Sequence, residues 1–158
     1  MLYSEVIRAL CSVLSFDEKT LTKVLLLGGN TLEPSIVSQL FVQSDQPEDF
    51  PGSSDLLRSF LEGLIVYRRG PSDHKQTVDH SDLTNNMILK KIRIAFEIKE
   101  KDIIEILTGV GRSLSKYELS AIFRKPGHRN YKACSDALLA DFLKGLLLRK
   151  DECTSKNA

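Results

Sequence analysis

The chain has 158 residues, of which 42% are hydrophobic and 27% are charged, and its formal net charge is +1. This composition predicts one compact domain or two small ones, and no apolar run approaches the roughly 18 residues of a membrane span. The N-terminal residues lack the basic start and cleavage site of a signal peptide, so we expect a cytoplasmic protein without a membrane partner.

An internal repeat with an offset of 82 residues is the strongest pattern in the sequence. Residues 4–41 align with residues 86–123 without a gap, and Gly29 then matches Gly111. After a divergent loop the segment 60–64, Phe-Leu-Glu-Gly-Leu, aligns with 142–146, Phe-Leu-Lys-Gly-Leu. Repeats of this kind define the architecture, so they are identified before the fold is assigned.

The repeat predicts an all-α fold made of two tandem copies of a four-helix unit. The units cover residues 1–70 and 85–150, with a polar linker at 71–84 and a disordered tail at 151–158. A unit of roughly 65 residues buries little of its surface when it is alone. We therefore expect the two units to pack together through apolar helix faces.

In the first unit, two features indicate where the third and fourth helices begin. Leu32 and Val37 have the spacing of a hydrophobic staple, and Pro34 lies where a first-turn proline is tolerated. The fourth helix is expected to start near Ser54 and to bury the side chains of Leu57, Phe60, Leu61, Leu64 and Ile65. The mid-helix Gly63 predicts close approach of another helix.

The linker contains His74 and His80 together with Asp79 and Asp82. These side chains can bind a metal ion, but they lack the spacing of a known ligand motif. A flexible polar segment is the simpler interpretation, and we expect no metal site and no cofactor.

The second unit repeats the four helices with clearer boundaries. Helices are predicted at about 86–97 and 100–110, and Gly111 ends the second of them. Ser115 and Glu118 have the spacing of a capping box that opens the third helix. The fourth helix starts near Ser135 or Asp136 and carries a run of apolar residues: Leu138, Leu139, Phe142, Leu143, Leu146 and Leu147.

A family resemblance rests mainly on residues 115–131, Ser-Lys-Tyr-Glu-Leu-Ser-Ala-Ile-Phe-Arg-Lys-Pro-Gly-His-Arg-Asn-Tyr, with support from 88–96, 102–107 and 142–146. The second unit is similar to the YehS-like family of bacterial proteins, a duplicated domain of unknown function. The resemblance implies a bacterial cytoplasmic protein with two tandem helical units. It implies no catalytic residues.

A basic loop follows the third helix of the second unit, and no acidic residue occurs between Glu118 and Asp136. Residues 125–128, Lys-Pro-Gly-His, are typical of a type II turn. Cations beside an aromatic ring can bind phosphates and stack on a base, but such a loop can also contact a protein or be only solvated surface. The candidate binding residues are Arg124, Lys125, His128, Arg129, Asn130, Tyr131 and Lys132.

Charge is distributed unevenly between the two units. Residues 1–72 hold six Lys or Arg and nine Asp or Glu, a net charge of −3, whereas residues 86–150 hold fourteen and seven, a net charge of +7. The segment 43–51 is acidic where its counterpart in the second unit is basic. Docking of one segment on the other, within a chain or between chains, is therefore a further possibility.

Two other site hypotheses have weaker support. A helix-turn-helix interpretation of residues 100–122 lacks the base-reading side chains expected on the first turns of a recognition helix. A nucleophilic pair of Cys134 and His128 lacks a third group to orient it, and the first unit has Gly52 in place of the cysteine. Three cysteines at unrelated spacings, Cys11, Cys134 and Cys153, also argue against disulfides.

These patterns favour a non-enzymatic binding module. The expected partner is a protein or a second copy of the chain, and the alternative is nucleic acid or another polyanion bound by the basic loop. The sequence shows no catalytic residues, no cofactor motif and no sign of a small-molecule substrate.

Overall fold

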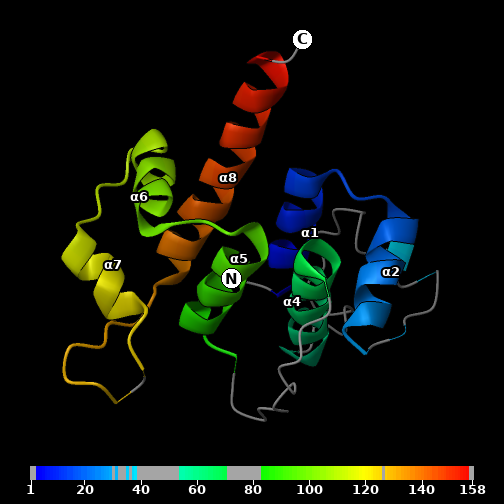
Figure 1. The fold of residues 1–158 in the computed structure, drawn as a ribbon, viewed down its shortest axis with the longest axis horizontal. Helices are drawn as coiled ribbons and strands as arrows, with labels where there is room; N and C mark the ends of the chain where they lie inside the picture. Colours follow the sequence, from blue (N-terminus) through cyan, green and yellow to red (C-terminus); the bar gives the residue numbers. More distant parts are fainter. Residues whose placement is uncertain are drawn as a thin grey trace. The chain divides into compact units, whose positions relative to one another are not determined.

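The computed structural model describes residues 3–29, 31, 35, 37, 38, 54–70, 83–125 and 127–156. These residues form helices and no strand, which confirms the predicted all-α class (Figure 1). Two compact units divide the chain, Met1–Leu83 and Thr84–Ala158. The packing of the units against each other stays a prediction.

Some sequence predictions lie outside the described residues. They are Leu32 and Pro34 at the start of the first unit's third helix, the acidic segment 43–51, and the histidines and aspartates of the linker. Within the parts of the chain that are described, no helix is both long and apolar enough to cross a bilayer.

The first unit is built around helix α4, Ser54–Arg69, which packs against α1, Tyr3–Leu14, and α2, Glu18–Leu27. Asp17 begins α2, because its side chain accepts a hydrogen bond from the Thr20 backbone N–H at 2.8 Å. The buried side chains of α4 include four of the five predicted ones, Leu57, Phe60, Leu61 and Leu64. Ile65 is only half-buried.

In the second unit, α8, Asp136–Lys156, packs against α5, Asn85–Phe96, and α6, Glu100–Gly109. The short helix α7, Lys116–Ile122, lies against α6 (Figure 1). The Ser115 half of the predicted capping box is confirmed, since Ser115 Oγ accepts from the Glu118 N–H at 3.2 Å. Ser135 Oγ likewise accepts from the Leu138 N–H at 3.1 Å, which begins α8.

The backbone reproduces the repeat at the offset of 82 residues. Adding 82 to the bounds of α1 and α2 gives the bounds of α5 and α6, and the first residue of α4 maps onto that of α8. Ser15 and Glu97 occupy equivalent positions and both adopt the left-handed conformation, with φ of 55° and 53°. Non-glycine residues seldom do so, which makes this shared backbone detail strong evidence for the repeat.

Close helix crossings explain the matched mid-helix glycines. A Cβ atom added at Gly63 would overlap the carbonyl oxygen of Val24 on α2. At Gly145 it would overlap the Ile106 side chain and lie 2.7 Å from the Ile106 carbonyl oxygen on α6. Val24 and Ile106 are themselves equivalent in the repeat, so each unit contains the same backbone contact, as the sequence predicts.

The units differ at the other end of this crossing. In the first unit Gly28 also leaves room for α4, because a Cβ there would overlap the Ser59 carbonyl oxygen. The close contact between α2 and α4 therefore extends from Val24 to Gly28. The second unit has Val110 at the position of Gly28. There an ion pair joins Arg112 to α8, with Arg112 Nε 2.5 Å from Asp141 Oδ2.

Two predictions about the fourth helix of the second unit differ from the structure. Leu147, which was predicted to be buried, is 38% exposed. The apolar residues of α8 extend around more of the helix than the neighbouring helices cover. Helix α8 also continues to Lys156, through most of the segment predicted to be a disordered tail. No proline or glycine occurs after Gly145 to end the helix.

Replacing either crossing glycine is expected to destabilise the protein. Gly63→Ala and Gly145→Ala should each lower the free energy of unfolding by about 1–3 kcal/mol, because overpacking outweighs the better helix propensity of alanine. Urea-induced unfolding followed by circular dichroism measures the change.

Gly109→Ala is the matched control in the same unit, because a Cβ there meets no atom within 4 Å. This variant should unfold at an unchanged or slightly higher urea concentration. Equal midpoints for Gly109→Ala and Gly145→Ala would contradict the close crossing.

Candidate functional site

The basic loop, defined as residues 124–133, begins directly after Phe123, which caps the C-terminus of α7. The Arg93 guanidinium on α5 lies 4.8 Å from the centre of the Phe123 ring. Arg93 Nε also donates a hydrogen bond to the Ile98 carbonyl oxygen at 3.2 Å. This cation–π contact attaches the entrance of the loop to α5.

Asn86, on the first turn of α5, holds both ends of the loop. Its side-chain nitrogen donates to the carbonyl oxygens of Ile122 at 2.9 Å and Lys132 at 2.8 Å, and its oxygen accepts from the Cys134 N–H at 2.8 Å. Asn86 is only 8% exposed, and it is the one buried polar residue found among the described positions. An amide is suited to this task because it combines two donors with an acceptor.

Asn85 adds a second link at the exit of the loop. Its side-chain nitrogen donates to the Cys134 carbonyl oxygen at 3.1 Å and to Asp136 Oδ1 at 2.6 Å. The hydrogen bond from Asn85 lowers the pKa of the Asp136 carboxyl group. The loop is therefore held at both ends by neighbouring side chains of α5.

Inside the loop, two consecutive turns set the backbone. The His128 N–H donates to the Lys125 carbonyl oxygen at 3.0 Å, and Gly127 has φ of +89°. Both features agree with the predicted type II turn, which needs a positive φ at this position. The Tyr131 N–H then donates to the His128 carbonyl oxygen at 3.0 Å.

The His128 ring is oriented by the loop itself. Its Nδ1 accepts a hydrogen bond from the Asn130 N–H at 3.1 Å, so in the neutral ring the proton lies on Nε2. Arg124 Nη1 lies 3.5 Å from that Nε2. Both atoms are then donors, and an anionic oxygen placed between them would accept from both.

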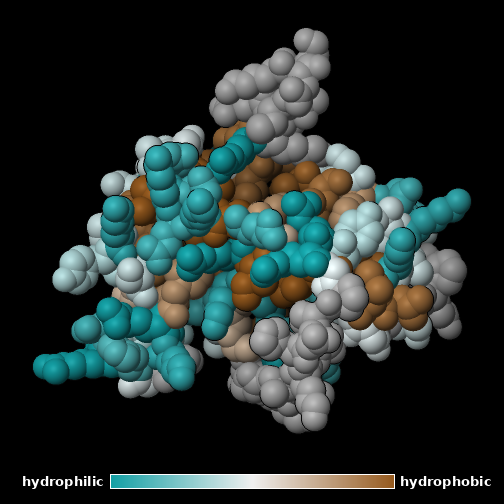
Figure 2. Space-filling model, viewed as in Figure 1, coloured by the Kyte–Doolittle hydropathy of each residue, from teal (hydrophilic) through white to brown (hydrophobic). Residues whose placement is uncertain are grey.

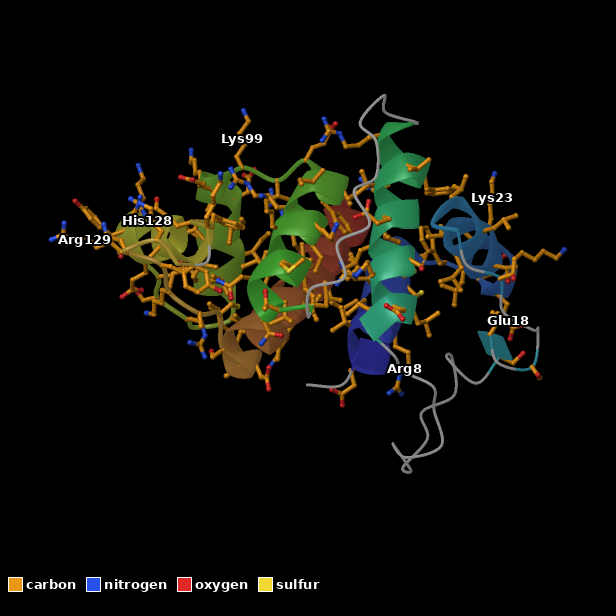
Figure 3. All side chains as sticks on the ribbon, turned by 90° about the horizontal axis from the view of Figure 1, so that it is seen from below. Arg8, Glu18, Lys23, Lys99, His128 and Arg129 are labelled. Atoms are coloured by element: carbon orange, nitrogen blue, oxygen red, sulfur yellow. The ribbon has the colours of Figure 1, made fainter. Side chains whose placement is uncertain are left out.

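Most side chains of the loop are exposed, and hydrophilic residues gather where it follows α7 (Figure 2). Figure 3 shows Arg129 pointing away from the protein at the outer edge of the second unit. None of the four loop cations has a carboxylate within ion-pair distance in the described structure, whereas Arg112 and Arg149 pair with Asp141 and Asp102. The cations concerned are Arg124, Lys125, Arg129 and Lys132.

The two tyrosines near the loop differ in exposure. Tyr131, the aromatic residue that the sequence offered for stacking, is half-buried. Tyr117, on the first turn of α7, is 89% exposed and the most exposed large hydrophobic side chain in the described residues. The face of an exposed ring is available to a ligand, and the sequence analysis did not select Tyr117.

The proposed Cys134–His128 pair does not form. Cys134 is 5% exposed, and its Sγ donates to the Ser135 carbonyl oxygen at 3.6 Å. The His128 ring nitrogens contact Asn130 and Arg124 instead. Burial raises the pKa of the Cys134 thiol to about 11, which disfavours the thiolate that a nucleophile requires.

Sequence reasoning therefore found the loop but missed the residues that position it. Asn85 and Asn86 carry no motif, and only the fold brings them to Cys134 and Asp136, about 50 residues later in the chain. The repeat offered one signal, because the first unit has Tyr3 and Ser4 at the equivalent positions. Neither residue carries an amide side chain.

No group of three His, Cys, Asp or Glu side chains with the arrangement of a metal site occurs among the described residues.

Comparison with known proteins agrees with the two-unit division. A family model described as "Protein of unknown function (DUF1456)" matches the chain twice, over residues 5–70 and 85–150. The chain belongs to the DUF1456 family. The uncharacterized protein YehS of Escherichia coli (strain K12) is 33% identical over 152 residues, which cover 95% of this chain and 97% of that relative. No solved structure matches the chain.

The resemblance to the YehS-like family is therefore confirmed. Neither the family nor the relative has a described function, so no residue of the basic loop acquires a role from them. A function for the loop can therefore be inferred only from its structure.

Asn86→Ala should release the loop and lower the free energy of unfolding by at least about 2 kcal/mol, because buried backbone groups of Ile122, Lys132 and Cys134 would lose their partner. The amide of Cys134 should also lose its protection from hydrogen exchange, which NMR measures. Asn85→Ala, at a half-buried site, should cost less than Asn86→Ala. Unchanged protection at Cys134 in Asn86→Ala would show that Asn86 does not hold the loop.

Cys134 should be nearly inert in the folded protein. Because burial raises the pKa of its thiol from 9.0 to about 11, the thiolate fraction at pH 8 is roughly 100-fold lower than in the unfolded chain. In a Cys153→Ser background, mass spectrometry should show that iodoacetamide labels Cys134 slowly until urea unfolds the protein. Equal labelling rates in the folded and unfolded chains would contradict this.

Proposed function

We propose that this protein is a non-enzymatic binding module whose second unit binds nucleic acid or another polyanion through the basic loop. The observation that carries the proposal is the set of exposed loop cations that no carboxylate neutralises in the described structure. Such cations bind phosphates by charge and by hydrogen bonding.

The way the loop is held supports this proposal. Asn86 ties the loop ends together, and two turns shape the backbone between them. A loop that is ordered before binding loses less conformational entropy when a ligand arrives. Arg124 Nη1 and His128 Nε2 lie 3.5 Å apart, so one phosphate oxygen can come within reach of both nitrogens.

The charge of the whole unit acts in the same direction. Residues 86–150 have a net charge of +7, which attracts a polyanion over a distance comparable to the Debye length. The first unit, with a net charge of −3 over residues 1–72, is not expected to contribute to this attraction.

Protein binding is the second candidate, and exposed apolar side chains favour it. Leu26 and Leu27 at the end of α2 are 60% and 40% exposed. Binding of a protein partner at Leu26 and Leu27 should not change when residues of the basic loop are substituted. A pull-down from cell lysate that compares the intact chain with basic-loop variants therefore separates the two candidates.

Salt dependence tests the polyanion proposal. A labelled oligonucleotide of random sequence should bind the intact chain at low salt, and its affinity should fall steeply as salt rises, because counterions are released on association. The triple variant Arg124→Gln/Lys125→Gln/Arg129→Gln should bind more weakly and reduce the slope of log K against log salt by about 2. Fluorescence anisotropy provides both values.

The matched control is the triple variant Lys19→Gln/Lys99→Gln/Lys101→Gln, which removes three positive charges from exposed lysines outside the basic loop. Figure 3 shows Lys99 apart from His128 and Arg129. This control should retain most of the affinity. Absence of binding by the intact chain at low salt, or equal losses in the two triple variants, would refute the proposal.

A further inference from the structure

The outer face of α7 joins an exposed aromatic ring to the basic loop. Tyr117 is 89% exposed, whereas Leu119 and Ile122 on the opposite face of α7 are 0% and 1% exposed. The helix is therefore anchored by its inner face, and Ser115 caps the turn that carries Tyr117. The ring therefore projects from a capped helical turn whose inner face is packed.

Helical spacing places this ring and the first loop cation on the same side. Tyr117 and Arg124 are seven residues apart, which is two turns or about 10 Å along a helix. One turn-type hydrogen bond, from the Arg124 N–H to the Ala121 carbonyl oxygen at 3.4 Å, keeps Arg124 beside the last turn of α7. Ser120 and Ala121, which follow Tyr117 by three and four residues, have small side chains and leave the ring uncovered on this face of α7.

Charge along this surface is predominantly positive. Lys116 precedes the ring, and Arg124 and Lys125 follow α7, all with exposed side chains. Glu118 is the acidic residue of α7 and is exposed as well; it and Lys116 each lie about 100° around the helix from Tyr117, on opposite sides of the ring, so the excess of positive charge comes from Arg124 and Lys125. An aromatic ring beside cations favours a ligand that has both flat rings and negative charges.

We propose that this surface binds single-stranded nucleic acid, with Tyr117 stacking on a base while Arg124 and His128 hold a phosphate. The inference rests on the proposed polyanion binding and adds a ligand class to it. A double helix presents phosphates but covers the faces of its bases, so a duplex can use the loop cations and not the ring. A single strand uses both, because stacking on aromatic side chains accepts any unpaired base.

The two tyrosines now have separate roles. Tyr131 is half-buried, so its ring has less surface to offer a base. Its backbone N–H closes the second turn of the loop on the His128 carbonyl oxygen at 3.0 Å. Tyr117 is the stacking residue, and Tyr131 belongs to the support of the loop.

Anisotropy titrations with labelled oligo(rU), oligo(dT) and a duplex of equal length test this inference on the intact chain. Tyr117→Ala should weaken binding of the single strands between roughly 5-fold and 100-fold and change duplex affinity less than about 2-fold. Tyr117→Phe keeps the ring and should retain single-strand affinity. Comparison of the two single strands shows whether the surface distinguishes RNA from DNA.

The outcomes separate this inference from the proposed function. If the triple loop variant weakens all ligands while Tyr117→Ala changes none, polyanion binding stands and stacking by Tyr117 is refuted. Equal loss of single-strand and duplex affinity in Tyr117→Ala refutes it too. If the intact chain binds none of the ligands at low salt, both proposals are wrong.

Discussion

The close crossing of two helices in each unit is the contact around which the units are built. Gly63 lets α4 approach the backbone of Val24, and Gly145 lets α8 approach that of Ile106. At Gly63 the nearest atoms are all backbone, and at Gly145 the Ile106 carbonyl oxygen limits the approach together with the Ile106 side chain. The apolar residues around each crossing are then buried at equivalent positions in both units: Leu21 and Ile103, Leu25 and Leu107, Phe60 and Phe142.

The segment that follows α7 differs in sequence and charge from its counterpart in the first unit. In the second unit that segment is basic and is held by Asn86, whose hydrogen bonds reach Ile122, Lys132 and Cys134. Residues that position the loop are therefore separate from the residues that would meet a ligand. Asn86 is buried and acts on the backbone, whereas Arg124 and Arg129 are exposed.

The same division between support and contact applies to the aromatic residues. The sequence pattern favoured Tyr131 because it lies within the basic loop, and it did not single out Tyr117. The fold distinguishes them because the register of α7 turns Leu119 and Ile122 inward and thereby turns Tyr117 outward. The orientation of the short helix α7 thus decides which ring is available for stacking.

The helical class, the duplication, the Ser115 cap and the turn around Gly127 could all be predicted from the sequence, because periodicity, caps and turns are local properties of neighbouring residues. Tertiary structure alone decided that Asn86 meets Cys134, that Tyr117 is exposed and Tyr131 is not, and that the Cys134 thiol is buried away from His128. These features join residues far apart in the chain or depend on which helix face is covered. Hydrogen bonding and burial of that kind leave no pattern in one sequence.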